Sequence, residues 1–204
     1  MELNMNRYLR GLKIIFRYLL FEWPLGLNFS LRDLSHISKS GRHGYAMTSD
    51  AALDNISKII PFEGKKFIDI GSGKGAVVYN AYKLGCVKSM GVESETGLHK
   101  IALKNFSLLK LNKTLKSINI PAESFHRYNE FDIFFLFNPF NHVIYEKVMD
   151  ALFSQLKYKD SKRYIICYGD ANLDAILKHS NAKEFYRGIC PFRKNRIVIF
   201  EVVV

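Results

Sequence analysis

Apolar residues recur at two different spacings along this chain. Before residue 61 they follow the helical period of three to four residues, first over residues 5–22 and again in the run that ends at Pro61. Trp23-Pro24 is expected to end the first of these two helices, because proline cannot continue one. A polar, glycine-containing segment over residues 35–48 separates them and is predicted to be a loop.

From residue 61 onward, short apolar runs alternate with helical segments. This alternation predicts a Rossmann-like, doubly wound α/β sheet of seven strands with helices on both faces, preceded by N-terminal helices. The last two strands are joined only by residues 190–196, too few for a crossover helix, so they should form a hairpin with one antiparallel strand. We therefore divide the chain into an N-terminal helical segment, 1–60, and a sheet domain, 61–204. The expected strands cover residues 67–70, 89–93, 115–120, 132–137, 164–168, 184–189 and 197–203, and the expected helices 76–84, 97–111, 142–156 and 173–178.

A glycine-rich turn follows the first expected strand of the sheet. The run from Asp69 to Gly75 reads Asp-Ile-Gly-Ser-Gly-Lys-Gly. Glycine tolerates positive φ angles and lets the backbone approach a ligand closely. Glu93 ends the next strand, where a carboxylate can accept hydrogen bonds from ribose hydroxyls. The two features together predict a site for a cofactor that contains adenosine.

Two cofactors fit this turn. Its G-x-G-x-x-G/A spacing suits a dinucleotide such as NAD, whereas its D-x-G-x-G-x-G spacing resembles motif I of class I S-adenosylmethionine-dependent methyltransferases. Three features favour the methyltransferase. Asp69 precedes the first glycine by two residues, helical sequence precedes the motif, and Asn138-Pro139-Phe140 follows a later strand.

From about residue 45 onward the chain resembles a small group of bacterial class I methyltransferases. Members of that group have a Y-x-x-T segment before the glycine motif, Asn-Pro-Phe after the fourth strand and an aromatic residue near the end of the fifth, here Tyr168. Many such enzymes carry Gly-Asp-Ala after the third strand to contact adenine. This chain has Ile120-Pro121-Ala122 there, so that contact falls to Glu123, Ser124 or a backbone group. The resemblance implies S-adenosyl-L-methionine as the cofactor and S-adenosyl-L-homocysteine as its product, and the candidate cofactor-binding residues are Tyr45, Thr48, Asp69, Gly71, Ser72, Gly73, Gly75, Glu93, Ser94, Glu123 and Asn138.

Asn138, Pro139 and Phe140 are the candidate catalytic residues. They resemble a shortened form of the Asp/Asn-Pro-Pro-Tyr/Phe motif of amino-group methyltransferases. The resemblance implies that the Asn138 amide and a backbone carbonyl accept hydrogen bonds from the target nitrogen while Phe140 packs on the substrate. The structural alternative is that Asn138 caps the next helix and Phe140 lies in the core. A hydroxyl acceptor would need a base, for which His43 and His142 are candidates, and no metal site is expected.

The net charge of the chain is +11, spread along its length. Such a charge favours anionic partners, whether nucleic acid, anionic lipid or a phosphorylated carrier, and it equally fits a solvated lysine-rich surface. The basic amphipathic helix over residues 5–21 would suit the inner face of the membrane. Its alternative is an ordinary helix packed on the domain or on a dimer partner. Three widely spaced cysteines and no apolar run near 18 residues predict a cytoplasmic protein.

Three functions remain open at this level. The leading one is methyl transfer to an amine or hydroxyl of a small molecule, a surface-glycan intermediate or a protein. The alternative, a nucleic-acid methyltransferase, is disfavoured by the lack of an RNA-binding module or target-recognition domain. The third is a non-catalytic cofactor-binding protein, because a fold does not fix a function.

Overall fold

The computed structural model of the chain describes residues 12, 15–30, 48, 50–157, 162–169, 172–191 and 194–203. Within these residues seven strands form one sheet in the order β3-β2-β1-β4-β5-β7-β6. All neighbouring strands are parallel except that β7 runs antiparallel to both β5 and β6. The expected sheet and its terminal hairpin are therefore confirmed. The strands are β1 (Lys66–Ile70), β2 (Lys88–Glu93), β3 (Leu115–Asn119), β4 (Ile133–Phe137), β5 (Arg163–Tyr168), β6 (Ala182–Ile189) and β7 (Arg196–Val202).

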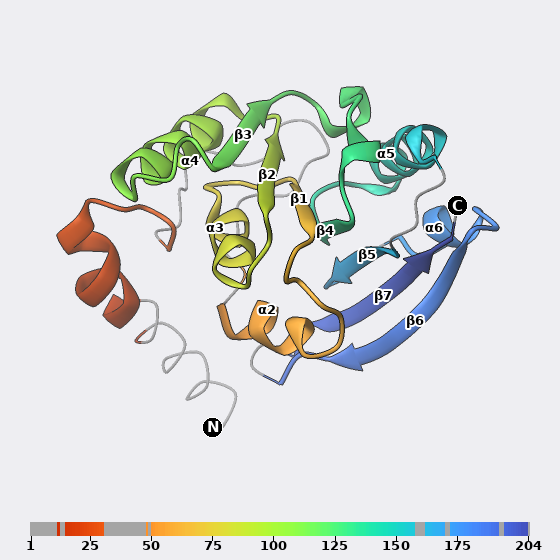
Figure 1. The fold of residues 1–204 in the computed structure, drawn as a ribbon, viewed down its shortest axis with the longest axis horizontal. Helices are drawn as coiled ribbons and strands as arrows, with labels where there is room; N and C mark the ends of the chain where they lie inside the picture. Colours follow the sequence, from red (N-terminus) through yellow and green to blue (C-terminus); the bar gives the residue numbers. More distant parts are fainter. Residues whose placement is uncertain are drawn as a thin grey trace.

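Helices cover both faces of this sheet (Figure 1). The helices predicted over residues 76–84, 97–111, 142–156 and 173–178 are present, as is the one before Pro61, whereas much of the helix predicted over residues 5–22 lies outside the described residues. Two short 3-10 helices after β3, η3 and η4, were not predicted. The helix after β2 ends three residues earlier than expected, because Lys110 adopts a positive φ of 58° that an α-helix cannot contain. The helices are α2 (Asp50–Ser57), α3 (Ala76–Lys83), α4 (Thr96–Leu108), α5 (His142–Gln155), α6 (Asp174–Leu177), the π-helix η1 (Tyr18–Glu22) and the 3-10 helices η2 (Trp23–Leu25), η3 (Ala122–Ser124) and η4 (Tyr128–Glu130).

The central strands bury side chains on both faces. In β4, Phe134 lies in the core cluster that contains Tyr145 and Met149 of α5, whereas the next residue, Phe135, lies in the cluster that contains Leu53 of α2. Successive residues of a strand point to opposite faces, and both faces are covered here. This arrangement explains why the strands read as continuous apolar runs.

The N-terminal part of the chain joins this core at two places. Helix α2 packs in the same cluster as β1 and β4, although the division at residue 60 would assign it to the N-terminal segment. Leu27 and Phe29 are buried against Ala76 of α3, and the Phe29 ring stacks on Tyr79 with centroids 5.9 Å apart. A helix able to cross a membrane is absent from the described part of the chain.

Candidate functional site

The glycine-rich turn lies at the carboxyl end of β1 and leads directly into α3. Gly71, Gly73 and Gly75 all have positive φ, between 53° and 83°. The turn is tied to the neighbouring strand β2, because the amide of Gly71 donates to the carbonyl of Val92 at 2.9 Å. A β-carbon on Gly71 would lie 2.7 Å from the β-carbon of Pro139. Glycine at position 71 therefore allows the turn and the Asn138-Pro139-Phe140 segment to touch.

Glu93 holds the same turn from the end of β2. Its Oε2 accepts a hydrogen bond from the amide of Gly73 at 2.8 Å, and its Oε1 accepts one from the amide of Glu95 at 2.7 Å. Burial raises the pKa of the Glu93 carboxyl above its ordinary value, and these two amide hydrogen bonds oppose the rise. Each carboxylate oxygen has a second lone pair, so Glu93 can order the turn and still accept hydrogen bonds from a ligand.

Asp69 and Ser72, which flank the first glycine of the turn, are both buried. Asp69 is buried within β1, and burial together with the charge of Glu93 holds its pKa well above the ordinary range. Ser72 turns its hydroxyl onto Gly91 of β2, where a β-carbon would lie only 2.3 Å from Ser72 Oγ. Within the described residues the turn is held by the Glu93 carboxylate and by backbone hydrogen bonds.

The turn also carries a buried lysine that was not among the predicted site residues. Lys74 is 1% exposed, and its Nζ donates to Asn28 Oδ1 at 2.8 Å. Asn105 of α4 joins the same contact, because its side chain accepts from the amide of Asn28 and donates to the carbonyl of Lys74. The segment before α2 is thereby bonded to the turn.

Asn138 directly follows β4 and adopts a positive φ of 40°, which is uncommon for a residue with a side chain. Its Oδ1 is buried and has no hydrogen-bond partner among the described residues. The helix that follows is capped by Asn141, whose side chain accepts from the amide of Ile144. The capping role considered for Asn138 is therefore filled by another residue. Phe140 is 9% exposed and lies in the core, as the structural alternative for it predicted.

The Asn138 amide rests on Gly169, the residue that follows β5. Gly169 has a φ of 96°, and a β-carbon there would lie 2.6 Å from Asn138 Oδ1. The amide of Gly169 donates to the carbonyl of Arg196 at the start of β7. Three strand ends thus meet at Asn138. Gly169 was missed in the sequence, although a glycine directly after an apolar strand is the signal that could have identified it.

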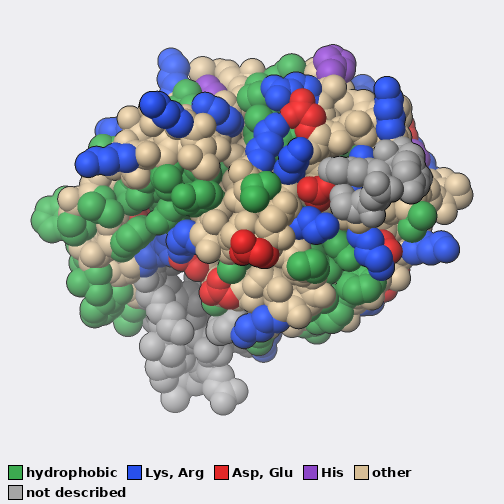
Figure 2. All heavy atoms as spheres, in the orientation of Figure 1, with side chains coloured by type: hydrophobic (Ala, Val, Ile, Leu, Met, Phe, Trp, Pro, Cys, Tyr) green, Lys and Arg blue, Asp and Glu red, His purple; other side chains and the backbone are tan. Residues whose placement is uncertain are grey.

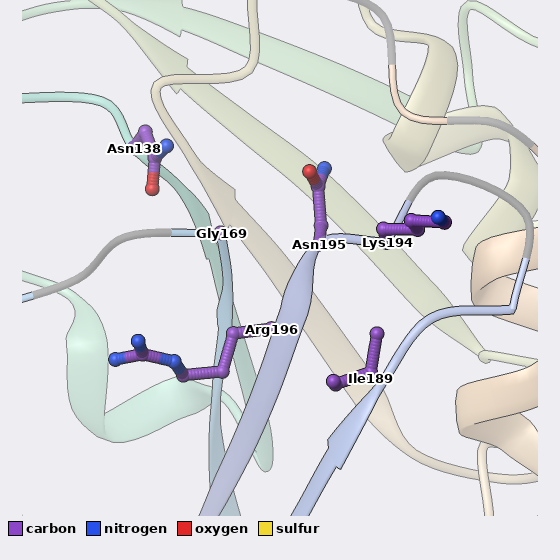
Figure 3. A pocket seen from close by; sticks show the side chains of 6 residues that line it. All are labelled: Asn138, Gly169, Ile189, Lys194, Asn195 and Arg196. Carbon is purple, nitrogen blue, oxygen red and sulfur yellow. The ribbon is translucent and has the colours of Figure 1, made fainter. Parts of the chain in front are cut away.

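A cavity of about 250 Å³ opens at these strand ends, lined by Asn138, Gly169, Ile189, Lys194, Asn195 and Arg196. Figure 3 shows the amides of Asn138 and Asn195 on the same side of the cavity, while the side chains of Lys194 and Arg196 extend in opposite directions. Neither cation forms an ion pair within the described residues. The cavity therefore offers amide groups for hydrogen bonding, with positive charge at its edges.

The other predicted residues lie around this centre or outside the described ranges. Ser94 follows Glu93 and is half-buried, Glu123 is half-buried on η3, and Thr48 is buried just before α2. The Asn119 side chain at the end of β3 donates to the carbonyl of Glu93, which brings the start of the η3 connection to the same edge of the sheet. His142, a candidate base, is exposed in the first turn of α5. Tyr45 and His43 lie outside the described residues.

Replacing Gly169 tests the contact with Asn138 without reference to any activity. Both Gly169→Ala and Gly64→Ala introduce a β-carbon at positive φ, which costs about 1 kcal/mol, but only Gly169 faces a crowded space. We expect Gly169→Ala to lower the free energy of unfolding by at least ~1 kcal/mol more than Gly64→Ala. The excess should disappear when Asn138→Ala is added, as measured by urea denaturation. An unchanged excess would mean that the clash lies elsewhere.

Comparisons with known proteins agree with this architecture. A family model described as "Conserved hypothetical protein 95" matches residues 46–185. No curated protein matches the chain in sequence. The chain is similar to an RNA methyltransferase from Salinibacter ruber, whose structure contains S-adenosyl-L-homocysteine, with a TM-score of 0.61, 14% identity and coverage of 78% of this chain and 94% of that one. It is similar to the ribosomal protein L11 methylase from Lactobacillus delbrueckii subsp. bulgaricus, with a TM-score of 0.61, 15% identity and coverage of 80% and 82%. The shared property at these identities is the fold.

Proposed function

Because the chain belongs to the family described as "Conserved hypothetical protein 95" and has the fold of methyltransferases, we propose that it transfers a methyl group from S-adenosyl-L-methionine to a nitrogen atom of its acceptor. The sulfonium of this cofactor supplies an activated methyl group. The protein then has to bind the cofactor, align the acceptor in line with the methyl group and let the acceptor lose its proton.

The residues around the glycine-rich turn fit this cofactor. Glu93 reaches the turn with a buried carboxylate whose two oxygens each use one lone pair on a backbone amide, which leaves lone pairs for two ribose hydroxyls. Gly71 keeps the surface of the turn free of a β-carbon where Pro139 approaches. The contact between Gly71 and Pro139 brings the glycine-rich turn next to Asn138, where we propose that the acceptor binds.

The observation that carries the proposal is the unsatisfied oxygen of Asn138. A buried carbonyl oxygen without a partner is costly, typically by about 1–3 kcal/mol, so a donor is expected to complete it. An amino or amide N–H of the acceptor can donate this bond, which would hold the nitrogen with its lone pair directed at the methyl group. A hydroxyl acceptor can donate as well, but it would then need a base, and His142 is the exposed candidate within the described residues.

We propose a small molecule, a glycan intermediate or a protein as the source of the acceptor nitrogen that enters the cavity beside Asn138. A nucleic acid is the second candidate, favoured by Lys194 and Arg196 at the edges of that cavity, by the net charge of +11 and by the RNA substrate named for the Salinibacter ruber enzyme. The L11 methylase supports a protein acceptor in the same way. A non-catalytic protein on this fold would bind the cofactor and transfer nothing.

We also propose that the protein works in the cytoplasm. Its three cysteines are all buried and free of disulfides, and burial raises the pKa of both Cys86 and Cys167 to about 12. Thiols in this state suit a reducing compartment.

Calorimetric titration with S-adenosylhomocysteine tests the proposal. Binding in the micromolar range is expected for the intact protein, and no heat of binding is expected with NAD. Gly73→Arg should abolish the signal, because residue 73 has a positive φ and its amide bonds to Glu93. Binding of NAD alone would overturn the assignment of the cofactor. Cofactor binding without turnover on any amine, protein or RNA acceptor would favour the non-catalytic protein.

A further inference from the structure

The helical segment before residue 26 turns its apolar side chains toward solvent. Leu20 is 74% exposed, Trp23 is 65% exposed and Phe16 is 61% exposed. This exposure is the reverse of the usual surface helix, whose apolar stripe faces the core. The members of this apolar surface, each at least 37% exposed, are Leu12, Ile15, Phe16, Leu19, Leu20, Phe21, Trp23 and Leu25.

The polar side chains of the same segment point inward and fix its orientation. Arg17 forms an ion pair with Asp50 of α2 and another with Glu22. Glu22 is fully buried and accepts hydrogen bonds at 2.8 Å from the amides of Phe29 and Ser30. Rotating the helix to bury its apolar side would break these bonds and leave a buried carboxylate unpaired, which is strongly unfavourable. These polar contacts therefore hold the apolar side chains of the segment toward solvent.

Exposed lysines border this apolar surface. Gly26, directly after it, packs on Leu108 at the end of α4, where a β-carbon would lie 3.7 Å from the leucine side chain. Lys104 and Lys110 lie four and two residues from Leu108 along the chain, and both are exposed. Neither forms an ion pair within the described residues. Figure 2 shows the resulting pattern at the left of the molecule, a broad hydrophobic band with lysine and arginine side chains above it.

We propose that this apolar surface, with Leu108 at its edge, docks on an anionic lipid membrane. Apolar side chains can enter the boundary between headgroups and acyl chains, tryptophan favours that boundary, and each nearby lysine adds attraction to anionic lipid. A second copy of the chain is the competing occupant. It would bring two lysine-bordered surfaces together across a twofold axis, and the like charges would repel. The exposed lysines therefore favour an anionic membrane over a second copy of the chain as the partner of this surface.

Docking on a membrane is a property beyond the proposed function, and it would bring the candidate site close to lipid. The chain continues from the apolar surface to Asn28, whose side chain accepts a hydrogen bond from Lys74 in the glycine-rich turn. An acceptor attached to a lipid or a lipid-linked carrier would then lie within reach of the site. Lipid binding itself requires neither cofactor nor methyl transfer.

Trp23 is the only tryptophan of the chain, so its fluorescence reports on this surface alone. We expect vesicles of phosphatidylcholine with one quarter phosphatidylglycerol to shift the emission to the blue and to sediment the protein. Vesicles of pure phosphatidylcholine should bind at least about tenfold more weakly. Lys104→Gln combined with Lys110→Gln should weaken binding to the anionic vesicles by about tenfold or more, since each lysine contributes electrostatic attraction.

Leu20→Glu should abolish the shift and the sedimentation. Leu177→Glu is the matched control, because Leu177 is a half-exposed leucine on α6, outside this surface. Equal binding by Leu20→Glu, or no binding by the intact protein, would overturn the proposal. Light scattering measures the oligomeric state and so tests the second copy as occupant. If the intact protein is a dimer that does not bind vesicles, and Leu20→Glu dissociates it, the surface belongs to a second copy of the chain. Calorimetry with S-adenosylhomocysteine is measured separately, so a failure here is distinguishable from a failure of the proposed function.

Discussion

Replacing Glu93 with alanine is expected to weaken S-adenosylhomocysteine binding at least 100-fold. The carboxylate would be lost both from the amides of Gly73 and Glu95 that shape the turn and from the ribose hydroxyls that we propose it binds. Hydrogen bonds to a charged group contribute about 1.5–3 kcal/mol each, and loss of two such bonds exceeds a hundredfold in affinity. Calorimetric titration of the purified variant measures the effect.

Glu95→Ala is the control for this substitution. Glu95 stands two residues away, is exposed, and caps α4 by accepting a hydrogen bond from the amide of Gly97. Its backbone amide, the part that contacts Glu93, survives the change. We expect a loss of about 1 kcal/mol in stability from the missing cap and an unchanged affinity. Equal losses of affinity in the two variants would mean that Glu93 has no special contact with the ligand.

Replacing Asn138 with alanine is expected to slow methyl transfer by about 10²–10³-fold, the range observed when one preorganised hydrogen-bonding group is removed from an active site. The buried Oδ1 is the atom proposed to hold the acceptor nitrogen, and it has no other partner within the described part of the chain. Affinity for S-adenosylhomocysteine should fall much less than the transfer rate, because Glu93 and the glycine-rich turn are untouched. Single-turnover transfer to an acceptor found by screening separates the two quantities.

Asn141→Ala provides the comparison from the same connection. Asn141 caps α5, so its loss should lower stability by about 1 kcal/mol and leave the transfer rate nearly unchanged. Similar rates in the two variants would return Asn138 to a structural role. The pair is informative because both substitutions remove an asparagine amide within four residues.

The sheet could be predicted from sequence because its evidence is local. Continuous apolar runs marked the central strands, and the short connection before Arg196 required a hairpin. The glycine-rich turn and Glu93 were identified by spacing alone, and both lie together as expected. These features depend on residues close in sequence or on simple chain geometry.

The contacts that sequence analysis missed join distant segments. Gly169 meets Asn138 only because β4 and β5 pair, and Lys74 meets Asn28 from 46 residues away along the chain. The orientation of the N-terminal helix was also beyond the sequence. Helical spacing shows which residues share a face, but it does not show whether that face turns inward. In this chain the ion pair between Arg17 and Asp50 of α2 sets which face of the helix turns inward.

The bond between Asn28 and Lys74 bears on where this chain can be shortened. The family match begins at residue 46, which suggests a natural starting point for a minimal domain. A chain cut there would lack Asn28, a hydrogen-bond partner of a buried ammonium in the cofactor turn, and Phe29, whose ring stacks on Tyr79. A chain that begins where the family match begins would therefore lose contacts that hold the glycine-rich turn.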